Sequence, residues 1–426
     1  MDAARHFPAL TGGGDWAFLE NAGGSAVPQQ VIDSTSQFLA TANWQLGAGY
    51  PGSQSAEAVV ASARQLVHAL ASRTPDAGFA ALGASTTAIL AMMGRGLEPC
   101  FRTGDVLIVS MAGHESNIGP WVRAARRSGA TLLWWPPQPD GRDTCPLDSL
   151  RELIAGADGF VRMVAFPHAS NLLGGIVDAA AVAAIARQAG ALTFCDGVAL
   201  APHRRVDCEC LGVDFYAVSL YKVFAPHIAA LFGTHNAWAT LRDWGCETPN
   251  HSFISQEPSG AIALWHPAYC WEPGGVSPEA CAGVCGLRKY FQDLTGQQSL
   301  DDAALVDAAF EAIAAGEHAV QAELASFFCE EHVKGTLRLL GPLTGDPSAR
   351  VPTFSFVPLT PGATPETVVA ACHAARVACR HGSMYAPRLC EHLGVHQVVR
   401  ISAVHYNSVN DARRCVDAIR SEIGNM

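Results

Sequence analysis

The sequence predicts an α/β protein in which a mostly parallel, seven-stranded sheet is followed by a smaller C-terminal α+β unit. Seven short apolar segments in the first two thirds of the chain have the composition of strands; they are residues 78–82, 105–110, 131–135, 161–166, 191–195, 215–219 and 228–232. Helical patterns lie between several of them, such as DAAAVAAIARQAG (178–190), which ends in a glycine at the C-cap position. Strands that alternate with helices favour a parallel sheet buried on both faces.

The pattern changes after about residue 290. A long helical stretch (301–328) precedes three short strands (337–340, 353–358 and 398–404) and a closing helix (410–423). We therefore expect an N-terminal segment (1–20), a large domain (21–290) and a small domain (291–426).

The composition limits the classes of function. The chain has 426 residues, 49% of them hydrophobic and 16% charged, with a formal net charge of −11. A chain of this kind can build a large core, and it has no basic stripe of the sort that binds nucleic acid. It has neither an apolar run long enough to span a membrane nor an N-terminal secretory signal, so we expect a cytoplasmic protein. Its 14 cysteines form no C-x-x-C pair, which favours free thiols and no metal site.

Two segments resemble known binding motifs, but their neighbouring residues do not match what those motifs require. Gly47, Gly49 and Gly52 spell G-x-G-x-x-G, but a helical pattern precedes them and Pro51 lies inside the motif, so a tight loop is favoured over a dinucleotide site. His114-Glu115 begins H-E-x-x-H, but position 118 is Ile, which excludes this zinc motif.

Lysine is scarce. Of the 28 basic residues only Lys222, Lys289 and Lys334 are lysines, which leaves 25 arginines. Lys222 lies three residues beyond the end of the apolar strand 215–219, where a buried amine needs a partner or a function. The other two lysines lie among charged neighbours and are expected to face solvent. Asp196 follows the strand 191–195, so a carboxylate and an amine are expected at one edge of the sheet.

An amine and a carboxylate are the two anchors that pyridoxal phosphate (PLP) chemistry requires. The amine forms a Schiff base with the cofactor aldehyde, and the carboxylate holds the pyridinium nitrogen. At about 4 Å and an effective dielectric constant near 20, the carboxylate contact is worth ~4 kcal/mol, or about three pKa units. Lys222 and Asp196 therefore predict a PLP site.

Further strand ends provide the remaining groups. Ser85 and Thr86 follow the first strand and can offer hydroxyl and N–H donors to a phosphate at a helix N-terminus, although a simple helix cap is the alternative. His114 follows the strand 105–110, and its imidazole can cover the cofactor ring. Asn171 follows the strand 161–166, and its amide can bond the ring hydroxyl.

With these residues in place, the chain resembles the class V aminotransferase superfamily of fold type I PLP enzymes, in its cysteine desulfurase-like and isopenicillin-N-epimerase-like branch. The resemblance covers nearly the whole chain and is strongest in GHESNIGPW (113–121), PHASNLLGG (167–175), CDGVALAPHRRVDCECLGVDFYAVSLYK (195–222) and CRHGSMYAP (379–387). It implies a homodimer with the active site at the subunit interface, acting on an amino-acid substrate.

The resemblance also implies a role for each candidate residue. Lys222 would form the internal aldimine and Asp196 would pair with the pyridinium, while His114 stacks on the ring and Asn171 lies near its hydroxyl. The residues implied for the phosphate are Ser85, Thr86, Ser219 and Tyr221. The residues implied for the substrate carboxylate are Arg400 and, as a weaker candidate, Arg380; a structural salt bridge is the alternative for both.

Three positions depart from the family pattern. Tyr385 stands where desulfurases that share the R-x-G loop carry the cysteine that takes up sulfur. Ala199 stands where relatives carry a Gln or His beside the ring oxygen. Gly275 stands where relatives carry a Thr that binds the phosphate of the cofactor in the neighbouring subunit; either Ser277 supplies this contact or the phosphate site is built differently.

These departures shape the expected reaction. After transaldimination, Lys222 would take the Cα proton and leave a carbanion. We expect a carbon–sulfur lyase that expels a β-substituent and needs no acceptor cysteine. Epimerisation, transamination and γ-elimination with ring formation are alternatives on the same scaffold, and a cofactor-free binding protein is the alternative from another class.

Overall fold

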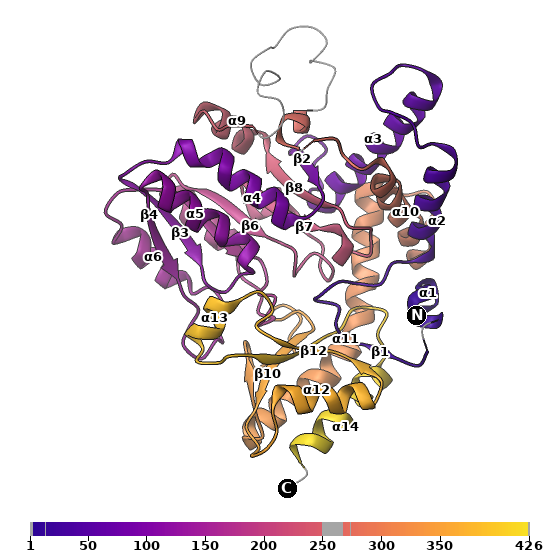
Figure 1. The fold of residues 1–426 in the computed structure, drawn as a ribbon, viewed down its shortest axis with the longest axis vertical. Helices are drawn as coiled ribbons and strands as arrows, with labels where there is room; N and C mark the ends of the chain where they lie inside the picture. Colours follow the sequence, from indigo (N-terminus) through magenta and orange to yellow (C-terminus); the bar gives the residue numbers. More distant parts are fainter. Residues whose placement is uncertain (1–2, 13, 249–266, 273, 425–426) are drawn as a thin grey trace.

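The structure is a computed structural model that describes residues 3–12, 14–248, 267–272 and 274–424. A seven-stranded sheet forms its centre (Figure 1). The strands, in spatial order, are β2 (Gly78–Gly83), β8 (Ala229–Thr234), β7 (Phe215–Ser219), β6 (Leu192–Asp196), β5 (Phe160–Pro167), β3 (Asp105–Ser110) and β4 (Thr131–Trp135). Strand β8 runs antiparallel to both neighbours, and all other pairings are parallel. The predicted seven-stranded, mostly parallel α/β sheet is confirmed.

Helices cover both faces of this sheet, because alternate residues of each strand point to opposite sides. In β3, Val106 and Ile108 join one apolar cluster, whereas Leu107 and Val109 join another. The first cluster includes side chains of α3 (Pro51–Ala71), α7 (Ala179–Gln188) and α10 (Pro278–Thr295). The second includes side chains of α4 (Thr86–Leu97), α5 (Gly119–Ser128) and α9 (His235–Asp243). Burial on both faces explains why these strands are apolar throughout.

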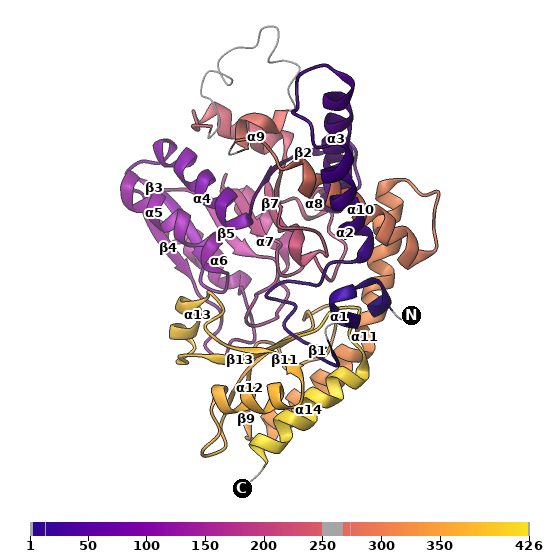
Figure 2. The same cartoon turned by 45° about the vertical axis from the view of Figure 1, so that its right-hand side comes forward.

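A second, antiparallel sheet lies in the C-terminal part of the chain. Its strands, in spatial order, are β12 (Arg380–Gly382), β13 (Val398–Ser402), β10 (Thr353–Pro358) and β9 (Leu337–Leu340). Helices α12 (Pro365–Ala374) and α14 (Val409–Ile423) pack on it around an apolar cluster (Figure 2). The N-terminal strand β1 (Ala17–Phe18) pairs with β11 (Val377–Ala378), so the start of the chain joins this C-terminal unit.

Helix α11 (Asp302–Lys334) connects the two units. It begins after Asp301, whose side chain accepts a hydrogen bond from the N–H of Ala304, and ends at Gly335, which adopts a positive φ of 78°. It contacts α3 and α10 of the large unit and α14 of the C-terminal unit (Figure 1). The remaining helices are α1 (Pro8–Gly12), α2 (Gln29–Thr41), α6 (Leu147–Ala155), α8 (Cys208–Leu211) and α13 (Pro387–His392), with short 3₁₀ turns between elements.

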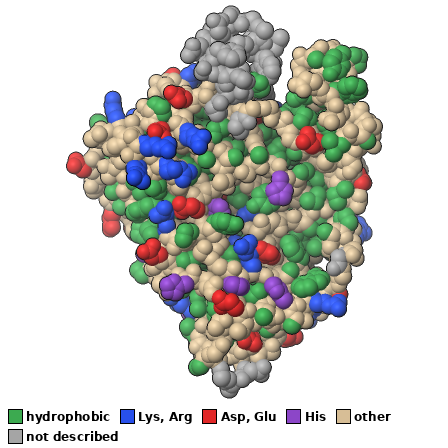
Figure 3. All heavy atoms as spheres, in the orientation of Figure 1, with side chains coloured by type: hydrophobic (Ala, Val, Ile, Leu, Met, Phe, Trp, Pro, Cys, Tyr) green, Lys and Arg blue, Asp and Glu red, His purple; other side chains and the backbone are tan. Residues whose placement is uncertain are grey.

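The surface shown in Figure 3 carries scattered charges, with Lys and Arg side chains gathered over the region of α4 and α5. None of the helices in the described residues is long and apolar enough to cross a membrane.

The glycines of the G-x-G-x-x-G segment form a turn: Gly47 and Gly49 have positive φ values of 78° and 76°, and α3 begins at Pro51. This turn follows α2 rather than a strand, so it lacks the setting of a dinucleotide site.

Candidate active site

One cavity opens at the carboxyl ends of the parallel strands. Strands β3, β5, β6 and β7 all end at this edge, and so does β2, which runs antiparallel to β8 and therefore parallel to β7. The cavity is lined by Thr86, Thr87, His114, Ser116, Pro167, Ala169, Asn171, Asp196, Val198, Ala199, Ser219, Tyr221 and Lys222. Most residues that the sequence singled out therefore meet at one place.

Lys222 lies at the end of a single 3₁₀ turn, Leu220–Lys222, that follows β7. Its side chain is buried, with 7% exposed, whereas Lys289 is exposed and Lys334 pairs with Glu330 and Glu331 on the surface. Ser25 fixes the backbone here, because its hydroxyl donates to the Lys222 carbonyl at 2.8 Å. Within the described residues, no hydrogen bond or ion pair reaches the Lys222 amine.

The buried environment of Lys222 favours a neutral amine. Burial lowers the pKa of Lys222 to about 8, helped by the positive charge of Arg400 and opposed by Asp196. At pH 7.5 such an amine is neutral in roughly a quarter of molecules, against about one in a thousand for an ordinary lysine. The site therefore holds a lysine prepared for nucleophilic attack.

Asp196 ends β6 and is likewise buried, with 5% exposed. Burial raises its pKa, opposed by a hydrogen bond from the Val198 N–H at 3.0 Å and by the charge of Lys222. For both groups, removal from water outweighs their mutual attraction. Gly197 allows this packing, because a Cβ there would lie 2.0 Å from the ring of Tyr216.

Hydroxyl groups gather beside the N-terminus of α4. Thr86 and Ser219 hydrogen-bond through their hydroxyls at 2.8 Å, and both line the cavity. The ring of Tyr221 also lines it and stacks on His227, with centroids 4.7 Å apart and planes 5° from parallel. Ser85 instead caps α4, since its hydroxyl accepts from the Ala88 N–H at 3.1 Å. The N-terminus of α4 and these hydroxyl groups together form a site suited to binding an anion.

His114 is a neutral imidazole with a defined tautomer. Burial lowers its pKa to about 4, assisted by the charges of Lys222 and Arg400. Its Nδ1 accepts the backbone N–H of Ser116 at 3.1 Å, and the Ser116 hydroxyl lies 2.7 Å from the same atom. The ring proton of His114 is therefore on Nε2.

Asn171 and Arg400 are buried together beside the cavity. One Arg400 N–H donates to the Asn171 carbonyl at 3.2 Å, but its Nε has no partner, and neither does the Asn171 Oδ1. No carboxylate in the described residues pairs with Arg400. Burial and the charge of Arg380 lower the pKa of Arg400 to about 10. An unpaired, buried guanidinium of this kind suits an anionic ligand.

Arg380 differs from Arg400 although the two are paired directly across β12 and β13. Its side chain is 44% exposed and forms an ion pair with Glu20 at 3.3 Å. The structural salt bridge, which was the alternative for Arg380, is present. Neither arginine is among the residues that line the cavity, but Arg400 contacts Asn171, which is.

The loop that carries Tyr385 closes over His114. Met384 and Tyr385 adopt positive φ values of 51° and 57°, which is a strained conformation for residues other than glycine. Two hydrogen bonds hold them: the Asn171 amide donates to the Met384 carbonyl at 2.7 Å, and the Glu115 N–H donates to the Tyr385 carbonyl at 2.8 Å. The Tyr385 ring lies 5.2 Å from the His114 ring, centroid to centroid.

The other two departures also have a place in the structure. Ala199 lines the cavity. Gly275 has open space around its Cα, and the Ser277 hydroxyl accepts the Ala280 N–H as the cap of α10. The described residues contain no group of three or more His, Cys, Asp or Glu side chains arranged to hold a metal ion.

Sequence reasoning missed several supporting residues. Ser116 sets the His114 tautomer, Ser25 fixes the Lys222 backbone and Thr87 lines the cavity. The position of Ser116, two residues after His114, is a local signal for a hydrogen bond from backbone to side chain. Ser25 is 197 residues from Lys222, and nothing local in the sequence indicates that contact.

Comparisons with known proteins agree with this geometry. A family model described as Aminotransferase class-V matches residues 17–289. The Aminotransferase-like protein FGM3 of Gibberella zeae is 33% identical over 413 residues, which cover 94% of this chain and 93% of that protein. The Cysteine desulfurase-like protein ustD of Aspergillus flavus is 29% identical over 422 residues, covering 96% and 87%. The apo structure of a cysteine desulfurase from Thermococcus onnurineus NA1 shares the fold, with a TM-score of 0.81 and 20% identity over 100% of this chain and 98% of that one.

Proposed function

This chain belongs to the aminotransferase class V family, and we propose that it is a PLP-dependent carbon–sulfur lyase that eliminates a β-substituent from an amino acid. The observation that carries the proposal is the buried Lys222 amine, with its pKa lowered to about 8, in a cavity that it shares with Asp196 and His114. Arg400 supports an amino-acid substrate, because its buried guanidinium has an unpaired Nε and contacts Asn171, which lines the same cavity.

The residues present fit PLP. Lys222 would hold the cofactor aldehyde, Asp196 the pyridinium nitrogen and the ring face of His114 the pyridine ring. Thr86, Ser219 and the N-terminus of α4 would bind the phosphate, with Ser85 contributing its backbone position and Tyr221 its hydroxyl. The unpaired Asn171 Oδ1 is an acceptor free for the ring hydroxyl. When bound, PLP draws electrons away from the Cα of an amino acid attached to it.

Three residues of the chain would then have separate roles in the reaction. Lys222 accepts the Cα proton at Nζ, and its low pKa keeps a fraction of the amine free to do so at neutral pH. Arg400 orients the substrate carboxylate, with Asn171 fixing the position of the guanidinium. His114 keeps a proton on Nε2 that it can donate, because its Nδ1 accepts the Ser116 N–H. The bond from Cβ to sulfur breaks with its electron pair moving to sulfur.

The thiols favour elimination over transfer to an enzyme cysteine. No cysteine of the described residues lines the cavity. The nearest in sequence to the Tyr385 loop, Cys379 and Cys390, are buried, with 4% and 3% exposed. A hydrogen bond with Cys372 together with burial raises the pKa of Cys379, and burial raises that of Cys390. Both are poor nucleophiles. Sulfur would therefore leave with the product.

The test is to incubate the purified, PLP-loaded protein with cysteine sulfoxides and cysteine S-conjugates. We expect pyruvate, ammonia and a sulfur product in equal amounts, and none from a Lys222→Ala variant. Borohydride should fix PLP on Lys222, which peptide mass spectrometry would locate. If the loaded protein releases neither pyruvate nor a sulfur product, the lyase proposal is wrong.

The same incubation in deuterated water separates the alternatives on this scaffold. Exchange at Cα with the amino acid retained would indicate epimerisation, and a keto acid with aminated cofactor would indicate transamination. Loss of a γ-substituent would indicate γ-elimination. A colourless protein with no borohydride adduct would instead indicate a binding protein without cofactor.

We also propose that the enzyme is a homodimer. Support comes from four exposed apolar side chains in α2 and in the segment that joins it to α3: Ile32, Leu39, Trp44 and Tyr50, which are 39%, 52%, 52% and 42% exposed. Large apolar groups that cluster on a surface mark interfaces. Light scattering should give twice the mass of the chain, and a Leu39→Glu, Trp44→Glu variant should give the monomer mass.

A further inference from the structure

Two cysteines outside the cavity lie side by side at the C-terminal end of α4. Cys100 ends the 3₁₀ turn Glu98–Cys100, and Cys246 follows α9. The two thiols are close enough for each to shift the pKa of the other. Both sulfurs also lie against Gly96: the Cys100 sulfur is 4.0 Å from its carbonyl oxygen, and the Cys246 sulfur is 3.4 Å from where a Cβ would stand. Both side chains are partly exposed.

The backbone holds these two segments in register. The Glu247 N–H donates to the Gly96 carbonyl at 3.0 Å. A Cβ at position 96 would lie 2.3 Å from the Glu247 carbonyl oxygen, so the close approach requires glycine there. The thiol pair is therefore positioned by main-chain contacts rather than by flexible side chains.

Arg162 gives the pair an electropositive side. Its guanidinium stacks on the Trp244 ring at 3.8 Å, two residues before Cys246, and lies 4.0 Å from Asp105. Its buried Nε has no hydrogen-bond partner. The contact with Cys246 and the charge of Arg162 lower the pKa of Cys100 against the opposing effects of burial and of Glu247, while the same contact raises the pKa of Cys246. Of the two thiols, Cys100 is therefore the one that ionises more readily.

Other thiols of the chain lack this combination. Cys210 is exposed, but its contact with Asp207 raises its pKa. Cys372 and Cys379 also contact each other, but both are buried and both pKa values are raised. Cys210 is therefore a control for a thiol that is only exposed, and Cys372 with Cys379 is a control for two thiols that are only close together.

We propose that Cys100 and Cys246 form an oxidation site that reacts with peroxides and closes to a reversible disulfide. The Cys100 thiolate attacks one peroxide oxygen, the O–O bond breaks, and Cys100 becomes a sulfenic acid while hydroxide leaves and is protonated. The Cys246 sulfur then attacks the Cys100 sulfur, its proton leaves with the hydroxyl as water, and an S–S bond forms. Two thiols are oxidised and one hydrogen peroxide is reduced to two waters. A dithiol reductant reverses the change.

The experiment uses the full-length, reduced protein with low hydrogen peroxide. Samples are alkylated at intervals, and the peptides are analysed by mass spectrometry. We expect a Cys100–Cys246 linked peptide, 2 Da lighter than the two reduced peptides, to appear before Cys210 is modified and while Cys372 and Cys379 stay reduced. Dithiothreitol should restore both thiols. Oxidation of Cys210 as fast as Cys100, or loss of the Cys100 thiol with no linked peptide, would overturn the proposal.

Variants separate the two chemical steps. Cys246→Ser should still oxidise at Cys100 but stop at the sulfenic acid, which dimedone would trap. Cys100→Ser should leave Cys246 reduced, and Cys210→Ser should change nothing. Arg162→Gln should raise the pKa of Cys100 and slow the first step about threefold for each pKa unit. Per unit, the thiolate fraction falls about tenfold while the remaining thiolate becomes about threefold more nucleophilic. Circular dichroism of each variant checks its fold, and equal rates at Cys100 with and without Arg162 would contradict the role of that charge.

Discussion

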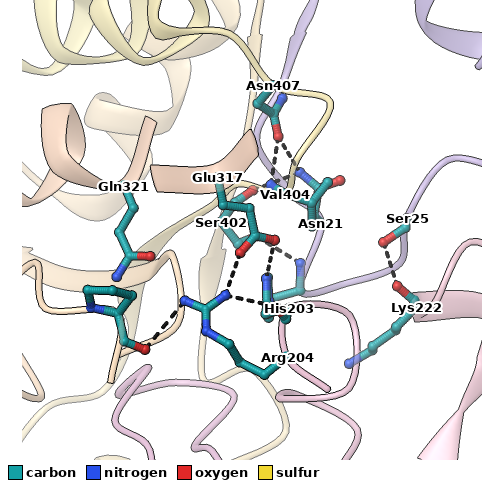
Figure 4. A network of polar contacts seen from close by, with 12 residues as sticks. Asn21, Ser25, His203, Arg204, Lys222, Glu317, Gln321, Ser402, Val404 and Asn407 are labelled. Atoms are coloured by element: carbon teal, nitrogen blue, oxygen red, sulfur yellow. Dashed lines mark hydrogen bonds and ion pairs between the residues drawn. The ribbon is translucent and has the colours of Figure 1, made fainter. Parts of the chain in front are cut away.

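Two buried polar regions of this molecule are built differently. Around Glu317 of α11, the charges are paired: one carboxylate oxygen bonds His203 Nδ1 at 2.7 Å and the other accepts from Arg204 at 2.9 Å (Figure 4). Around Lys222 the opposite holds. In the described residues no hydrogen bond or ion pair reaches its amine, which lies 6.0 Å from the centre of the Tyr221 ring, and Arg400 and Asn171 each keep an unpaired buried atom.

This difference distinguishes polar groups that stabilise the fold from polar groups that are available to a ligand. Pairing compensates the cost of burial at Glu317, so the region stabilises the junction of α11 with the loop that follows β6. Unpaired groups at the cavity carry a free-energy cost that folding alone gives no reason to retain. A ligand that supplies a ring nitrogen, a hydroxyl and a carboxylate would satisfy them.

The largest effect should come from Lys222→Ala. Removing the amine removes both the covalent anchor and the base, so we expect turnover to fall by at least about 10³-fold. Product release with cysteine S-conjugates measures it. Lys289→Ala is the matched control, since that lysine is exposed, and its activity should equal that of the wild type. Substantial turnover in Lys222→Ala would remove the mechanism.

Glu317→Gln tests the paired region. Breaking a buried ion pair leaves His203 and Arg204 without a charged partner, and we expect about 3 kcal/mol less stability in urea unfolding. Glu323→Gln is the control on the same helix, because its pair with Arg413 is exposed and should cost less than about 1 kcal/mol. The folded Glu317→Gln protein should keep its kcat. A large fall in kcat with unchanged stability would reverse the contrast between the two regions.

The cavity side of this contrast could be predicted from the sequence, but the Glu317 side could not. Apolar runs located all seven strands, because burial on both faces leaves a clear signal, and the cavity-lining Lys222 and Asp196 follow directly on two of them. The Glu317 network joins residues more than 100 positions apart, and the contact of Ser25 with Lys222 spans 197. Such pairings depend on tertiary packing, so local patterns cannot reveal them. The same limit explains Arg380, whose partner Glu20 lies 360 residues away.

Arg400→Lys tests the unpaired guanidinium. A lysine keeps the charge but loses the planar pair of donors, so we expect kcat/KM to fall about 30-fold, mainly through KM. Arg380→Lys is the matched control from the facing strand and should stay within about threefold, since its ion pair is exposed. Steady-state kinetics of both variants gives the answer. Equal losses would show that the two arginines act together on the substrate.

The last predicted effect is a gain in stability. The folded pKa of Lys222, about 8, lies below its ordinary 10.5, so the unfolded chain binds more protons between these values and the unfolding free energy rises with pH across this window. Below about pH 8 the full penalty is present, up to about 3 kcal/mol. In cofactor-free protein, Lys222→Met keeps the volume and removes the penalty, so it should be more stable than the wild type at pH 7 and lose that advantage toward pH 10.5. Urea unfolding at both pH values measures the difference, and groups common to both proteins cancel. A variant no more stable at pH 7 would mean that the amine is solvated in the folded state, and the cavity would then lack the low polarity on which its nucleophilicity depends.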